Sequence, residues 1–123
     1  MAMRLRTMLG PWAVSGPAIA IGRQALRDRA WRRLAGAARA ADAARLDALL
    51  APVADRPLRG TSLYRLLESR QAPDLFVHLG HRGIWVRRFQ HDSGLLRFGL
   101  PGNETAWKRM ADALGTFVVT QTV

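Results

Sequence analysis

Residues 94–102 read GLLRFGLPG, a short apolar run with one arginine in its middle. The run and the Pro-Gly pair that closes it predict a β-strand over residues 95–100. Successive side chains of a strand point to opposite faces of the sheet. The face that we expect to point to the core consists of Leu96, Phe98 and Leu100. The other face consists of Leu95, Arg97 and Gly99.

Arg97 therefore stands on the open face of the predicted strand. An always-charged guanidinium is costly to bury without a partner, and its planar set of donors suits a carboxylate or phosphate held by two hydrogen bonds. Gly99, on the same face, leaves room for a ligand or another backbone to approach. Spacing alone nevertheless favours an ordinary arginine on a solvated sheet face, so an anion-binding role for Arg97 needs a second argument.

The N-terminal part of the sequence predicts two helices. Ser15 followed by Gly16-Pro17 is typical of a helix start, and this helix should run to about Arg27. Asp28 is a suitable cap for a second, alanine-rich helix that ends before Pro52. Large residues are missing from the middle of its apolar stripe, so a heptad coiled coil is not supported.

The C-terminal part alternates between strand and helix patterns. Besides residues 95–100, strands are expected at 61–67 and 84–89, and a short helix at 73–82. Asn103 should cap a last helix through Trp107, Met110 and Leu114 that ends at Gly115. The tail FVVTQTV is β-prone but has no visible partner strand, so it is left unassigned.

These elements predict one α+β domain over residues 1–123. The expected parts are a lead-in segment (1–16), a helical part (17–52), a strand-helix-strand-strand-helix part (58–115) and a tail (116–123). We expect a small three-stranded sheet with helices packed on one face, preceded by two helices. The other face of such a sheet is free for a partner.

The formal net charge of +10 invites a nucleic-acid interpretation, but the distribution of charge argues against it. Lys108 is the only lysine among 19 basic residues, and the arginines are spread from Arg4 to Arg109 instead of forming one block. No nucleic-acid motif with an aromatic or zinc signature is present. Solvated arginine-rich faces are the expected explanation, and nucleic acid is an unfavoured partner.

The sequence gives no indication of a metal site or a membrane span. It has no cysteine, and the i, i+3 pair His78 and His81 has no second ligand pair beside it. The longest mostly apolar stretch, residues 11–22, is shorter than the roughly 20 residues that a spanning helix needs. The start MAMRLRTMLGPWAVSG is a poor signal peptide, because it has a Pro-Trp pair in its apolar part and no clean cleavage site. We therefore expect a cytoplasmic protein.

Several blocks of sequence resemble a known enzyme family. The chain is similar, over roughly residues 3–115, to the C-terminal part of fold-type I pyridoxal-phosphate enzymes of the aminotransferase class I/II superfamily. Within that superfamily it most resembles the threonine-phosphate decarboxylases of cobalamin biosynthesis. The blocks are GPWAVSGPA (10–18), RDRAW (27–31), GTSLYRL (60–66), GHRGIWVRRF (80–89), LRFGLPG (96–102) and an Asn-Glu-x-x-Trp helix start (103–107).

The resemblance implies a substrate-binding role for Arg97, because the arginine of the family's Leu-Arg-Phe-Gly block grips the substrate α-carboxylate. It implies pyridoxal phosphate (PLP) as the parent enzyme's cofactor and L-threonine O-3-phosphate as its substrate. The segment 12–15 would approach the active site from the large domain, and Arg87 and Arg88 match a common double arginine. No catalytic, cofactor-binding or metal-binding residue is assigned to this chain.

The sequence departs from the family in one important respect. The family's cofactor lysine, the aspartate that pairs with the pyridine nitrogen and most of the phosphate-binding residues lie in a large PLP-binding domain that this sequence does not contain. Lys108, in the final helix, does not match the cofactor lysine by motif. We therefore expect the isolated chain to bind no PLP covalently and to be inactive.

Two other functions stay open on the sequence. The first is a fragment of a histidinol-phosphate-type aminotransferase, because the shared blocks do not separate decarboxylation from transamination. The second is a small basic module that binds nucleic acid or protein, which the charge of +10 motivates. The free sheet face also makes homo-oligomerisation an expectation to test.

Overall fold

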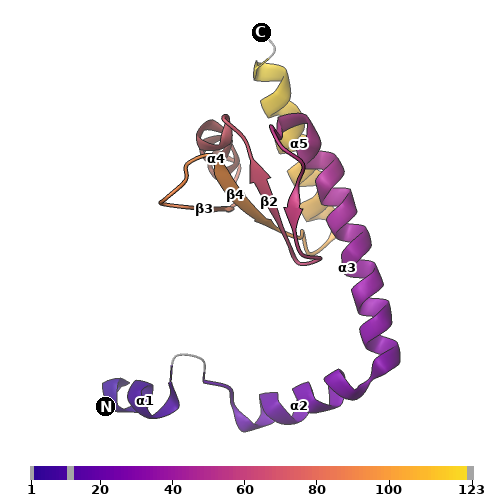
Figure 1. The fold of residues 1–123 in the computed structure, drawn as a ribbon, viewed down its shortest axis with the longest axis vertical. Coiled ribbons are helices and arrows are strands. Elements are labelled where there is room, and N and C mark those ends of the chain that lie inside the picture. Colours follow the sequence, from indigo (N-terminus) through magenta and orange to yellow (C-terminus); the bar gives the residue numbers. More distant parts are fainter. Residues whose placement is uncertain (1, 11–12, 122–123) are drawn as a thin grey trace. The chain divides into compact units, whose positions relative to one another are not determined.

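The computed structural model describes residues 2–10 and 13–121, so Pro11 and Trp12 of the expected lead-in segment (1–16) lie outside the described residues. The chain divides into two units, residues 1–35 and 36–123. Each unit is described by itself (Figure 1).

The first unit contains the helices α1 (Ala2–Leu9) and α2 (Gly16–Arg27). As predicted, Ser15 is the N-cap of α2, and its side-chain oxygen accepts a hydrogen bond from the Ala18 N–H at 3.4 Å. This bond satisfies one of the free backbone donors at the helix start. Helix α1 was not predicted, because the sequence of this segment was considered only as a poor signal peptide.

Asp28 starts the next helix, α3 (Arg29–Leu50), as predicted. Its Oδ1 accepts a hydrogen bond from the Trp31 N–H at 2.9 Å. Asp28 also closes α2, because its own N–H donates to the carbonyl oxygens of Gln24 and Ala25. One residue therefore separates the two helices.

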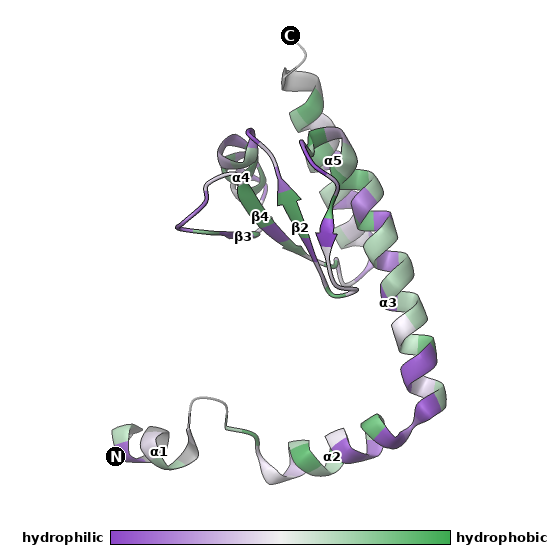
Figure 2. Cartoon of the chain, in the orientation of Figure 1, coloured by the Kyte–Doolittle hydropathy of each residue, from purple (hydrophilic) through white to green (hydrophobic). Residues whose placement is uncertain are grey.

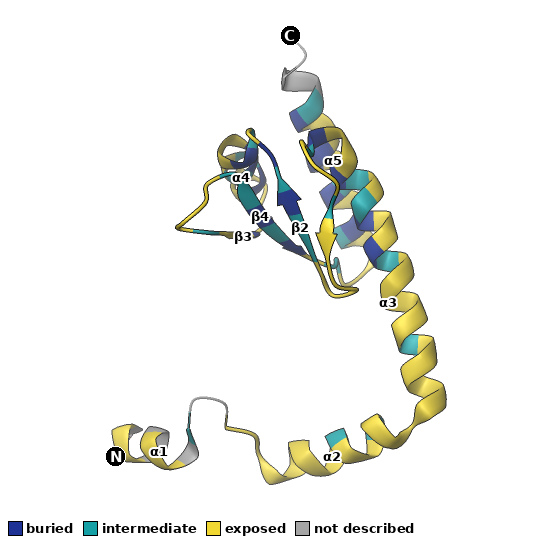
Figure 3. Ribbon diagram, viewed as in Figure 1, coloured by how far each residue is buried: buried dark blue, intermediate teal, exposed yellow. Residues whose placement is uncertain are grey.

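No described side chain of residues 1–35 is buried, and Figure 3 shows α2 almost entirely exposed. Helix α2 nevertheless has an amphipathic sequence, in which Ile19 and Leu26 lie on one side, two turns apart. The exposed large apolar side chains of this unit are Met3, Met8, Val14, Ile19, Ile21, Leu26, Trp31 and Leu34.

The second unit is an α+β sandwich of helices on a small sheet. After the C-terminal part of α3 come the 3-10 helix η1 (Ala51–Val53), β1 (Arg59–Gly60), β2 (Tyr64–Glu68), α4 (Ala72–His81), β3 (Arg87–Arg88), β4 (Leu95–Gly99) and α5 (Glu104–Gln121). The described strands form one antiparallel sheet in the order β1-β2-β4-β3.

The described sheet has four strands instead of the three predicted, and the first two predicted strands are shorter than expected. The Oγ1 atom of Thr61 accepts hydrogen bonds from the Leu63 and Tyr64 N–H groups, so a turn occupies the start of the segment predicted as strand 61–67. The N–H of Ile84 donates to the carbonyl oxygen of Leu79 at 2.9 Å. Because this bond closes α4, residues 84–86 do not join the ladder.

All helices of this unit cover the same face of the sheet, as predicted. The inward side chains of the two central strands, Leu67, Leu96 and Phe98, are buried with residues from α3, α4 and α5 (Figures 2 and 3). The helices contribute Leu46 and Leu50 from α3, Ala72, Leu75 and Leu79 from α4, and Trp107, Met110, Ala113, Leu114 and Phe117 from α5.

The turn between β1 and β2 requires glycine at position 60. Gly60 has a φ of +137°, and a Cβ placed there would lie 2.2 Å from the carbonyl oxygen of Tyr64. That oxygen accepts a hydrogen bond from the Thr61 N–H at 2.9 Å. The close approach of the two strands at this point therefore depends on the missing side chain.

Helix α5 begins where the sequence predicts and ends later. Asn103 caps it, since the Asn103 Oδ1 accepts from the Ala106 N–H at 2.9 Å. The predicted end at Gly115 is wrong: the helix continues to Gln121 and includes most of the unassigned tail. The reason is packing, because Phe117 is buried in the core and its ring centroid lies 5.1 Å from that of His78.

The continuation of α5 predicts the effect of Gly115→Ala. An interior helical glycine is less favourable than alanine by about 0.5–1 kcal/mol, and a Cβ at Gly115 meets no atom within 4 Å. We expect the variant to be more stable by that amount in urea denaturation followed by circular dichroism. A loss of stability would instead place Gly115 at a left-handed helix end, where alanine is strained.

Candidate functional site

Arg97 lies on the open face of the sheet. Its Cα pairs with Leu66 of β2 on one side and with Arg87 of β3 on the other, while its chain neighbours Leu96 and Phe98 are buried. The guanidinium carbon is 4.6 Å from the centroid of the Tyr64 ring. The alternation read from the sequence therefore placed this arginine on the correct face.

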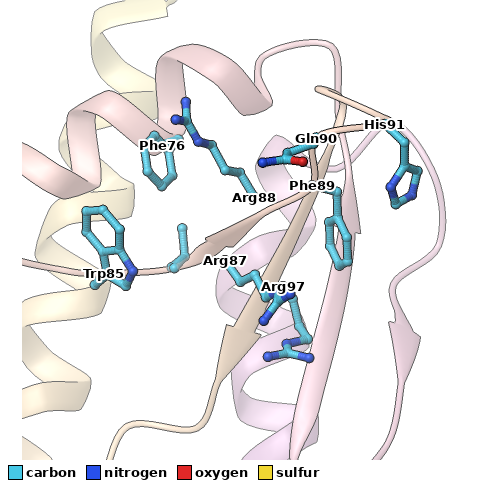
Figure 4. Close-up of a pocket in the computed structure, with 9 residues that line it drawn as sticks. Phe76, Trp85, Arg87, Arg88, Phe89, Gln90, His91 and Arg97 are labelled. Carbon is cyan, nitrogen blue, oxygen red and sulfur yellow. The ribbon is translucent and has the colours of Figure 1, made fainter.

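Arg87 stands directly opposite Arg97 in the β3–β4 ladder. Figure 4 shows the two side chains extending to the same side of the sheet. Like charges directly opposite each other in a sheet are unfavourable unless a counter-charge lies between them. Among the described residues neither arginine forms an ion pair with a carboxylate. The pair is therefore a site of uncompensated positive charge.

A hollow of about 700 Å³ surrounds these arginines (Figure 4). Aromatic and basic side chains line it, and no aspartate or glutamate does. A cavity with convergent cationic donors and no acid favours an anionic ligand. The lining residues are Phe76, Trp85, Val86, Arg87, Arg88, Phe89, Gln90, His91 and Arg97.

Aromatic rings form the walls of this hollow. Trp85 is 84% exposed and meets Phe76 edge-to-face with 5.5 Å between ring centroids. Arg88 extends toward Phe76, with its guanidinium carbon 5.0 Å from the ring centroid. The sequence did not single out Phe76 as a site residue. Its position in the wall follows from its contacts with Trp85 and with Arg88 of β3.

Three acidic side chains of this unit are paired with arginines other than Arg87 and Arg97. Asp47 of α3 accepts two hydrogen bonds from Arg65, at 2.6 and 2.8 Å. Glu104 accepts two from Arg45, and these bonds hold the pKa of Glu104 below its usual value. The backbone N–H of Arg70 lowers the pKa of Asp55 in the same way. Each of these three carboxylates is therefore already paired with an arginine.

His78 has structural surroundings. His78 of α4 donates from Nε2 to the Ala113 carbonyl oxygen of α5 at 2.8 Å, and its Nδ1 accepts from Arg82 at 3.2 Å. Within the part of the chain that the structure describes, no three His, Asp or Glu side chains gather where they could hold a metal ion. Residues 2–10 and 13–121 likewise contain no helix long and apolar enough to cross a membrane.

Comparisons with known proteins show what the sequence is similar to. Over 110 residues, which is 89% of the chain, the sequence is 37% identical to a threonine-phosphate decarboxylase of Pseudomonas aeruginosa. Over 106 residues it is 36% identical to a threonine-phosphate decarboxylase of a Sinorhizobium species. The chain resembles threonine-phosphate decarboxylases. The resemblance inferred from the sequence blocks is therefore confirmed.

The similarity to threonine-phosphate decarboxylases covers only part of those proteins. The chain spans 33% of the length of the Pseudomonas relative and 31% of the Sinorhizobium relative. No protein-family model matches the sequence.

The uncompensated arginine pair predicts anion binding by the chain itself. In a titration with inorganic phosphate, we expect the Nε–Hε NMR signals of Arg87 and Arg97 to move in a saturable way. Arg65 is the internal control, because its bonds to Asp47 already occupy its donors. Added sodium chloride should weaken the response, since partly exposed charges are screened. Equal shifts of all three arginines would indicate unspecific charge attraction instead.

Proposed function

We propose that this chain is the small-domain segment of a PLP-dependent L-threonine O-3-phosphate decarboxylase. The observation that supports this best is the pair Arg87 and Arg97, which borders an acid-free hollow at the β3 edge of the sheet. The sequence similarity to two threonine-phosphate decarboxylases supports the same reading.

In this proposal Arg97 binds the substrate α-carboxylate. A guanidinium offers parallel N–H donors that match the two oxygens of a carboxylate, which fixes the orientation of the substrate as well as its affinity. Arg87, opposite in the ladder, adds positive potential to the same hollow. L-threonine O-3-phosphate bears both a carboxylate and a phosphate, so a hollow with several cations and no acid suits it.

The described residues of this chain do not fit PLP itself. PLP enzymes of this family bind the cofactor through a lysine, and Lys108 is the only lysine of the sequence. Its side chain is 77% exposed on α5 and its Nζ donates to Asp112 at 2.7 Å. We therefore assign the cofactor, and with it the loss of CO₂ that yields (R)-1-amino-2-propanol O-2-phosphate, to a separate large domain. The chain alone is expected to be inactive.

The exposure of residues 1–35 supports a large partner domain. Among the side chains of this stretch that the structure describes, eight large apolar ones are exposed and none is buried, so they form no core of their own. Such apolar surface favours burial against another protein surface. The proposed occupant is the PLP-binding domain, and self-association of the isolated chain is the alternative.

The role of Arg97 is tested in a hybrid enzyme, in which this chain replaces the matching 110-residue segment of the Pseudomonas relative. A hydrogen bond to a charged group contributes about 1.5–3 kcal/mol, so Arg97→Ala should raise KM for L-threonine O-3-phosphate roughly ten- to hundredfold. Arg97→Lys should keep KM close to the raised value of Arg97→Ala, because a lysine lacks the paired N–H donors of a guanidinium.

Arg70→Ala is the matched control for this experiment, since it removes the same charge from a side chain that is 93% exposed. We expect the control to keep the KM of the unmodified hybrid. Unchanged KM and kcat in Arg97→Ala would contradict the assignment of Arg97.

A further inference from the structure

We propose that Tyr64 is a positioning residue for Arg97, whose ring holds the guanidinium in place while leaving its N–H groups available to an anion. The identity of the anion rests on the proposed function, but the contact between the two side chains does not. The evidence is the way in which the arginines of this unit are held.

Arg65 shows how an arginine is fixed when its role is structural. Its Nε and Nη2 donate to the two carboxylate oxygens of Asp47, and further donors reach the carbonyl oxygens of Leu58 and Thr61. The side chain is 14% exposed. The charge of Arg65 is therefore neutralised by Asp47, and its N–H groups form hydrogen bonds within the protein.

Arg97 is held differently. Among the described residues its side chain makes no hydrogen bond and no ion pair, and its guanidinium carbon lies 4.6 Å from the centroid of the Tyr64 ring. An aromatic ring attracts a cation through its face, whereas the N–H donors of a guanidinium lie in the guanidinium plane. Contact with a ring thus restrains the side chain without neutralising its charge, which a carboxylate partner would do.

The sheet register brings the two side chains together. Tyr64 pairs with Gly99, which is two residues after Arg97 on the same face of β4. Diagonal neighbours of this kind lie within reach of an aromatic side chain. The ring lies beside Gly99, since a Cβ placed there would be in ordinary van der Waals contact with the Tyr64 Cε1 at 3.9 Å.

The aromatic ring, and not the hydroxyl group, is the part that the proposal requires. No hydrogen bond of the Tyr64 hydroxyl is found among the described residues, while the backbone N–H of Tyr64 is fixed by the Thr61 Oγ1 at 3.3 Å. Tyr64→Phe should therefore keep the contact and Tyr64→Leu should lose it. The pair of variants separates the role of the ring from that of general apolar burial.

The contact is tested in the full 123-residue chain by NMR. Tyr64 is the only tyrosine, so selective labelling gives one set of ring signals, and we expect these to show nuclear Overhauser effects to the Arg97 side chain. Ring current should shift the Arg97 side-chain protons upfield in the original chain and in Tyr64→Phe. In Tyr64→Leu these protons should return to the positions typical of a free arginine. Equal Arg97 shifts in all three proteins would overturn the proposal.

The consequence for binding is tested with inorganic phosphate, read at the Arg97 Nε–Hε signal. A cation–π contact contributes about 0.5–2 kcal/mol, so Tyr64→Leu should weaken binding roughly two- to thirtyfold, whereas Tyr64→Phe should match the original chain. Leu63→Ala is the control, because it removes apolar surface from a neighbouring residue that is 54% exposed. The Arg65 signal should be the same in every variant.

The outcomes separate the two proposals. If phosphate does not move the Arg97 signal in the original chain, the anion site of the proposed function fails, while the Tyr64 contact is still judged by the ring-current shifts. If phosphate binds equally well to the original chain and to Tyr64→Leu, the anion site stands and the positioning role of Tyr64 is wrong.

Discussion

The register of the antiparallel ladder between β2 and β4 determines which side chains of these two strands point into the core and which lie on the open face. This register sends Leu67, Leu96 and Phe98 into the core and leaves Tyr64 and Arg97 on the open face. A slip by one residue would exchange the two faces, burying an arginine and exposing a phenylalanine. The hydrophobic core therefore fixes the orientation of Arg97, although Arg97 itself takes no part in the core.

The sequence predicted those parts of the fold that depend on local chemistry. Ser15, Asp28 and Asn103 each cap a helix as expected, because a short polar side chain before an apolar helix satisfies free N–H groups in any context. The face of β4 was also predictable, since alternation of apolar and polar residues determines it. The same alternation identified Arg97 as a residue on the open face.

The features that the sequence did not predict depend on contacts between distant residues. Helix α5 continues beyond Gly115 because Phe117 is buried in the core. The residues next to Gly115 in the sequence do not indicate that packing. The strand predicted at 84–89 shortens because the N–H of Ile84 closes α4. The position of Arg87 opposite Arg97 follows from the β3–β4 pairing, so the uncompensated charge of the hollow was visible only in three dimensions.

The glycine at position 60 limits how this protein can vary. Any side chain there would collide with the carbonyl oxygen of Tyr64, and relief of that collision would displace the start of β2. Tyr64 would move with its backbone, and the ring beside Arg97 with it. A substitution at this position, outside the hollow, would thus disturb the contact between Tyr64 and Arg97. Among folded variants of this chain, we expect position 60 to accept few replacements even though Gly60 is exposed to solvent.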